Sequence, residues 1–168
     1  RGDKITNVVM MGMGEPLLNY EAVFKAISLM CSESGLGLGG RKVTLSTAGY
    51  VPGIIKLAKS SLNIGLAISL NGTTNKIRDS IMPINRRFKI EDLISAAKLF
   101  YSMRGYGVTF EYVLIDSITD GIENAKRLGD LVAGIPCKIN LIPYNEFDYK
   151  MEFRRPSQNK LDDFYETL

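Results

Sequence analysis

A single carboxylate follows the first apolar segment of the chain, at a position suited to ligand binding. Residues 7–16 pass from an apolar run through Gly12 and Gly14 to Glu15 and a proline. An apolar run that ends in Gly-x-Gly is typical of an interior strand entering a turn. Because glycine has no Cβ, backbone here can approach a ligand closely, and Glu15 would suit an ammonium group. A plain strand-to-helix turn gives the same pattern.

The composition excludes several other kinds of chemistry. The chain has no histidine, which removes Ser-His and Cys-His nucleophiles and histidine metal ligands. Its two cysteines, Cys31 and Cys137, lie far apart in the sequence and have no metal-ligand spacing. We expect both to be small core residues. Any reaction must therefore use carboxylates, amides, hydroxyls or a bound cofactor.

Length and composition are those of one globular domain, which we place at residues 1–168. The chain is 45% apolar and 23% charged, which is ordinary for a folded protein. No apolar run is long enough to span a bilayer, and the first residues are not a signal peptide. We therefore expect a cytoplasmic protein without membrane segments. A net charge of +3 permits a nucleic-acid partner without requiring one.

Strand-like and helix-like segments alternate along the chain. The clearest helix has Ile90, Leu93, Ile94, Ala97 and Tyr101 on one face. After the opening strand, further strands are predicted at residues 42–47, 64–70, 108–115 and 138–142. Helices are predicted after Asn19, a candidate N-cap, and at 52–60, 90–101, 122–133 and from Pro156, with 75–87 irregular because Pro83 stops a helix begun at Ile77.

This alternation favours a parallel sheet with right-handed crossovers. A closed barrel, a partial barrel and an open doubly wound sheet all remain possible from the pattern alone. Residues 64–70 are apolar on both faces, which is typical of the middle of a covered sheet. The last helix carries a stripe of Leu161, Phe164, Tyr165 and Leu168 that reaches the final residue without a stop signal. We therefore expect a portion of a longer protein.

Polar residues lie at or just after the carboxyl ends of the predicted strands, at the edge where parallel folds bind ligands. Each residue alone is explained by a turn or a helix cap. Together they resemble a site for a zwitterionic small molecule, because the edge is polar and mostly uncharged. These residues are Gly14, Glu15, Ser46, Thr47, Ser69, Asn71, Asp116 and Asn145.

Five segments in this order resemble the RlmN and Cfr group of radical S-adenosylmethionine (SAM) RNA methyltransferases, over about residues 5–145. They read MGMGEPL, VTLSTAG, AISL, IRD with MPIN, and CKINLIPYN. The second and fifth are more similar to the RlmN branch. The resemblance implies a partial (β/α) barrel of about five parallel βα units. It also implies a monomer that methylates C2 of an adenine in 23S rRNA and in some tRNAs, using SAM and a 4Fe-4S cluster.

The resemblance also implies which residues bind SAM. Gly14 and Glu15 match the motif that holds the methionine end, where a carboxylate faces an ammonium group. No catalytic residue and no metal ligand is carried over to this chain. The remaining cofactor-binding residues are Ser46, Ser69, Leu70, Asn71 and Asn145.

Three features depart from the family pattern. Asn71 stands where the family usually has histidine, and asparagine cannot take up a proton near neutral pH. The Cys-x3-Cys-x2-Cys motif that ligates the cluster is absent, and so is the catalytic cysteine pair. We therefore expect the central portion of such an enzyme, supplying most of the SAM site but transferring no methyl group alone.

Two other functions fit the same residues. One is a non-catalytic SAM- or nucleotide-binding βα module. The other is a βα enzyme that binds phosphate at residues 12–14, although no Lys or Arg follows that loop closely. Six basic residues could contact an RNA backbone, and they are equally explained as solvated loop residues: Arg41, Lys42, Arg86, Arg87, Arg154 and Arg155.

Overall fold

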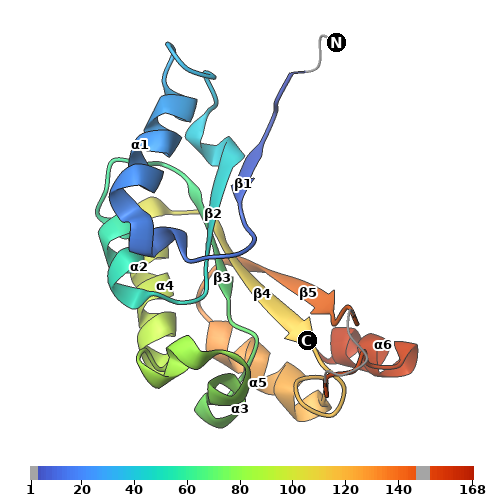
Figure 1. Cartoon of the computed structure of the whole chain (residues 1–168). Helices are drawn as coiled ribbons and strands as arrows, with labels where there is room; N and C mark the ends of the chain where they lie inside the picture. The colour runs from blue at the N-terminus through green and yellow to red at the C-terminus, as the bar shows by residue number, and fades with distance from the viewer. Residues whose placement is uncertain (1–3, 147–151) are drawn as a thin grey trace.

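Five parallel strands form one sheet in which every strand lies beside its neighbour in the sequence (Figure 1). The structure, a computed structural model, describes residues 4–146 and 152–168. A doubly wound sheet would reverse its strand order partway across, and this sheet does not. The predicted partial barrel is therefore confirmed. The strands are β1 (Val8–Met10), β2 (Val43–Thr47), β3 (Gly65–Ser69), β4 (Val108–Leu114) and β5 (Cys137–Pro143).

Helices connect the strands, and α1, α2 and α4 lie together on one side of β1 to β3 (Figure 1). This arrangement follows from right-handed crossovers, which return each helix to the same face of the sheet. The helices are α1 (Tyr20–Cys31), α2 (Val51–Ala58), α3 (Asn75–Ile81), α4 (Ile90–Arg104), α5 (Ile122–Val132) and α6 (Gln158–Thr167). Short 3-10 turns are η1 (Pro16–Asn19), η2 (Gly40–Lys42) and η3 (Pro83–Arg86).

The segment 75–87 is more ordered than predicted. Helix α3 begins at Asn75, because the Thr74 hydroxyl accepts a hydrogen bond from the Ile77 amide at 3.2 Å. Pro83 comes two residues after α3 ends and opens η3, which confirms that it stops the helix. In contrast, Asn19 occupies the N-cap position of α1 but makes no capping hydrogen bond.

The two faces of the sheet differ in chemistry. On the helix-covered face, Leu45, Leu66 and Val108 are in register and buried. On the opposite face, Ser69 and Glu111 are in register and only half-buried. Because side chains alternate along each strand, one face builds the hydrophobic core and the other presents polar groups.

The opening strand was predicted to be interior, and this is wrong for the part of the chain that the structure describes. β1 pairs only with β2 and is therefore an edge strand. Val9 is 60% exposed, although its neighbours Val8 and Met10 pack against the core. A continuous apolar run shows that both faces are apolar, but it does not show how many neighbours the strand has.

The stripe predicted for α6 is only half correct. Leu161 and Phe164 are buried against the core, and the Phe164 ring stacks on Tyr112 with centroids 5.5 Å apart. Tyr165 and Leu168 are instead exposed, at 75% and 39%. The buried face of α6 is narrower than its apolar stripe, because only one side of the helix contacts α5 and Tyr112 of β4.

Candidate ligand-binding site

A cavity of about 430 Å³ opens at the carboxyl ends of β1, β2 and β3. The loop after β1 forms one wall, and the end of β2 forms another. Ser69 at the end of β3 and Val23 of α1 contribute to the lining. Such a volume suits a small molecule, since ligand sites are commonly about 300–1,000 Å³. The full lining is Met10, Met11, Gly12, Met13, Gly14, Glu15, Pro16, Asn19, Val23, Ser46, Thr47, Ala48 and Ser69.

Gly12 and Gly14 shape the loop through their backbone conformation. Their φ angles are +122° and +95°, a region that residues with a Cβ rarely adopt. A Cβ at either position would meet no atom within 4 Å, so the protein itself does not crowd them. The glycines therefore allow the chain to reverse from β1 into η1, and they leave space beside Glu15.

The Glu15 carboxylate is held by donors from two parts of the chain. Its Oε1 accepts a hydrogen bond from the Leu17 amide at 3.0 Å, which caps η1. Its Oε2 accepts from the Thr47 hydroxyl at 2.9 Å and from the Ala48 amide at 2.8 Å. A carboxylate offers about four acceptor positions, so about one remains for a ligand. Glu15 is therefore a fixed anion at the cavity wall.

Two serines and one further carboxylate extend the polar surface. Ser46 and Ser69 line the cavity, and the Ser69 hydroxyl donates to Glu111 Oε2 at 3.2 Å. Glu111 lies opposite Ser69 on the polar face of the sheet. Glu111 was not predicted from the sequence, because it lies within β4 and not at a strand end. The alternation of polar and apolar residues along β4 was the signal that marks this face.

The structure brings four of the predicted cofactor ligands together at the cavity: Gly14, Glu15, Ser46 and Ser69. Leu70 is fully buried in the core instead. Asn71 adopts φ +53°, accepts from the Val113 amide at 3.1 Å and donates to Met82 Sδ at 3.6 Å. Asn145 is exposed after β5. Cofactor contacts by these last three residues stay predictions.

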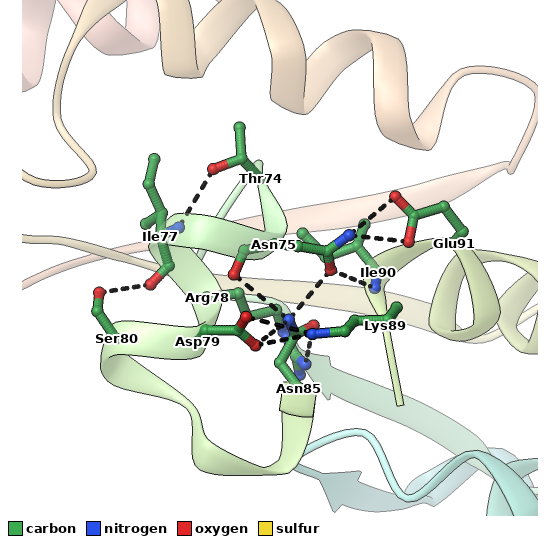
Figure 2. Close-up of polar contacts among 10 residues, drawn as sticks. All are labelled: Thr74, Asn75, Ile77, Arg78, Asp79, Ser80, Asn85, Lys89, Ile90 and Glu91. Atoms are coloured by element: carbon green, nitrogen blue, oxygen red, sulfur yellow. Dashed lines mark hydrogen bonds and ion pairs between the residues drawn. The ribbon is translucent and has the colours of Figure 1, made fainter. Parts of the chain in front are cut away.

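A polar cluster lies in the segment that connects β3 to α4 (Figure 2). The Asn85 amide nitrogen donates to Asp79 Oδ1 at 2.7 Å, and its oxygen accepts from Arg78 Nη1 at 3.1 Å. Lys89 forms an ion pair with Asp79 at 3.2 Å. Arg78, Asp79 and Asn85 belong to the segments that resemble the family, but no role was predicted for them or for Lys89 from the sequence.

We expect this cluster to make stability sensitive to acid. The hydrogen bond from Asn85, followed by the contacts with Lys89, holds the pKa of Asp79 below its ordinary value. A lowered folded-state pKa contributes stability above the unfolded pKa, and that contribution is lost as pH falls through the folded value. Urea denaturation below about pH 4 should show a loss of stability that Asp79→Asn makes shallower. The exposed control Asp130→Asn should retain the wild-type acid response, and equal slopes in both variants would refute the assignment.

The chain matches the family model described as the Radical SAM superfamily over residues 1–129. It is 47% identical over its whole length to a dual-specificity RNA methyltransferase RlmN of Pelobacter propionicus, covering 48% of that protein. A probable RlmN of Clostridium acetobutylicum is 43% identical over 99% of the chain, which again covers 48% of that relative. The chain thus spans about half the length of the curated relatives it matches.

Solved structures give the same picture of the fold. A radical SAM methyltransferase from Sphaerobacter thermophilus superposes with a TM-score of 0.94 at 42% identity, over 99% of this chain and 48% of that one. A domain of a pyruvate-formate lyase-activating enzyme from Bacteroides vulgatus has a TM-score of 0.70 at 17% identity, over 96% of this chain and 91% of that one, and supports the fold alone. No helix within residues 4–146 and 152–168 is long and apolar enough to cross a membrane.

Proposed function

The chain belongs to the radical SAM superfamily, and on that premise we propose that it forms the SAM-binding part of an RlmN-type RNA methyltransferase. The proposed substrate of the whole enzyme is C2 of an adenine in 23S rRNA and in tRNA. We further propose that residues 1–168 act as one domain in a cytoplasmic monomer. The observation that carries the proposal is the Glu15 carboxylate, fixed by three donors at the wall of the cavity.

The cavity fits the methionine end of SAM in charge and in polarity. Glu15 would bind the ammonium group through its remaining acceptor position, as a charge-assisted hydrogen bond. The hydroxyls of Ser46 and Ser69 offer further polar contacts, and Met10 and Val23 supply apolar wall. SAM supplies an activated methyl group and, in radical SAM enzymes, the source of a carbon radical. The residues of this chain would bind and orient it.

The chain does not fit a 4Fe-4S cluster. Three cysteine thiolates are needed to leave one iron open for SAM, and the whole sequence contains two cysteines. Cys31 ends α1 and Cys137 begins β5, and burial raises the pKa of the Cys137 thiol, which disfavours the thiolate. Among the residues with described positions, no group of three or more Cys, His, Asp or Glu could hold a metal.

Basic residues on the same side of the sheet as the cavity, its carboxyl edge, support an RNA partner. Arg86 and Arg87 lie between β3 and α4, and Arg155 lies between β5 and α6, all exposed on segments that follow carboxyl strand ends. Arg41 and Lys42 precede β2 and so belong to the opposite edge. An RNA bound near the cavity would therefore meet the first group and not the second, because phosphate contacts need cations on the same surface.

The proposal is tested by displacement of labelled SAM from the chain. Methionine is expected to displace SAM, because the site centres on a carboxylate that recognises the amino-acid end. Adenosine monophosphate should compete less well. A nucleotide-binding module would show the reverse order, which would overturn the proposal.

Treatment with iron and sulfide should yield no stable 4Fe-4S spectrum and no methyl transfer by the chain alone. A stable cluster would contradict the conclusion that the residues of this chain do not fit one.

A further inference from the structure

Arg78 of α3 is fully buried, and its guanidinium binds the ends of two strands. Its Nε donates to the Leu70 carbonyl at 2.9 Å, and its Nη2 donates to the carbonyls of Ala48 at 2.6 Å and Ser69 at 3.2 Å. All three acceptors are main-chain carbonyls, and the fourth bond, from Nη1, goes to the side-chain oxygen of Asn85. Burial lowers the pKa of Arg78 to about 10, which still leaves it charged near neutral pH.

The surrounding backbone leaves room for this side chain. A Cβ on Gly49 would lie 2.9 Å from Arg78 Nη2, and a Cβ on Gly72 would lie 3.1 Å from the Arg78 backbone nitrogen. Gly49 also has φ +114°, so other residues would be strained there. Two glycines thus permit a buried cation that is costly to desolvate. We therefore expect the buried Arg78 to have a role that compensates for the cost of its desolvation.

A chain of hydrogen bonds links Arg78 to Glu15. Arg78 Nη2 donates to the Ala48 carbonyl, and the N–H of the same peptide group, on Gly49, donates to the Thr47 hydroxyl at 3.1 Å. The Thr47 hydroxyl in turn donates to Glu15 Oε2 at 2.9 Å. Every donor points from the cation toward the anion, so each bond polarises the next.

We propose that Arg78 is a positioning residue for the ligand cavity, acting on Glu15 through the Ala48–Gly49 peptide and the Thr47 hydroxyl. It also binds the Ser69 carbonyl, so one guanidinium sets the spacing of two cavity walls. That the ligand is SAM rests on the function proposed above. The effect on Glu15 does not, because all of its contacts lie within this chain.

The test compares Arg78→Lys with Arg104→Lys. Arg104 also donates from Nη2 to main-chain carbonyls, those of Leu57 at 3.0 Å and of Ser60. Leu57 lies in the last turn of α2 and Ser60 lies just after it, and neither residue lines the cavity. Lysine keeps the charge at both positions, but its single ammonium cannot replace a guanidinium that bridges several carbonyls. A general loss of stability would therefore affect both variants, whereas loss of positioning would affect only the first.

Amide hydrogen exchange, followed by NMR, reads the position of Glu15 directly. The Leu17 and Ala48 amides both donate to its carboxylate. In Arg78→Lys we expect these two amides to exchange about five- to thirtyfold faster relative to core amides, and in Arg104→Lys to keep the wild-type ratio. Thr47→Val removes the hydroxyl from the chain of hydrogen bonds between Arg78 and Glu15. It should give the same local increase in exchange rate, and it replaces Arg78→Lys in the test if that variant does not fold.

Unchanged exchange ratios at Leu17 and Ala48 in these variants would overturn the positioning role. SAM affinity, measured on the same samples, separates this result from the proposed function. Faster exchange together with weaker SAM binding in Arg78→Lys supports both proposals. Faster exchange in a chain whose wild type binds no SAM supports the role of Arg78 and overturns SAM as the ligand.

Discussion

Replacing Glu15 with glutamine is expected to weaken SAM binding about a hundredfold, which corresponds to about 2–3 kcal/mol. Glutamine removes the charge that pairs with the ammonium group. It also replaces one acceptor oxygen with an NH₂ group, which must then face either the Leu17 amide or the Thr47 and Ala48 donors. The variant therefore loses both the anion and its orientation. Isothermal titration with SAM measures the change.

Glu21→Gln is the matched control for this experiment. Glu21 lies in the first turn of α1, where its exposed side chain pairs with Lys56. Exposed ion pairs contribute little to stability, and Glu21 does not line the cavity that contains Glu15. We expect wild-type SAM affinity in the control. Equal affinities in the two variants would show that Glu15 is not a SAM ligand.

Replacing Phe164 with alanine is expected to destabilise the chain by about 3–5 kcal/mol. Phe164 is fully buried and joins α6 to the core through its stacked contact with Tyr112. Tyr112 is itself fully buried in β4, and its hydroxyl donates to the Thr119 carbonyl, so it cannot move freely into the space left behind. Urea denaturation measures the loss as a lower midpoint with a similar slope.

Tyr165→Ala tests the same helix at the adjacent position. Tyr165 is 75% exposed, so its removal should change the free energy of unfolding by no more than about 0.5 kcal/mol. Both aromatic residues belong to the stripe predicted from sequence, and the structure divides them. Comparable losses from the two substitutions would mean that α6 packs in a different rotation.

Most of the fold was predictable because its signals are local. The helix face of Ile90, Leu93 and Ala97 repeats with helical period, and the structure buries all three. Strand β3 is apolar along its length and lies in the middle of the sheet, as predicted. Strand order and the edge position of β1 depend on contacts between distant segments, which periodicity does not report.

The candidate site was predictable in part for the same reason. Glu15, Ser46 and Ser69 were found because each lies at or just after the carboxyl end of a strand, and parallel strands bring these ends to one edge. Glu111 was missed because its role depends on the register of β3 against β4. Arg78 was missed because a charged residue in a short helix is usually exposed, and only the tertiary structure shows what it binds.

The most direct test of the account is an NMR titration of the ¹⁵N-labelled chain with SAM. We predict saturable shift changes in the amides of Gly14, Glu15, Ala48 and Ser69, at the carboxyl ends of β1 to β3. A second cavity, lined by Arg41, Tyr106 and Lys138, lies at the amino ends of the strands and serves as an internal control. Shift changes confined to that second cavity, or no saturable changes at all, would contradict a SAM site built around Glu15.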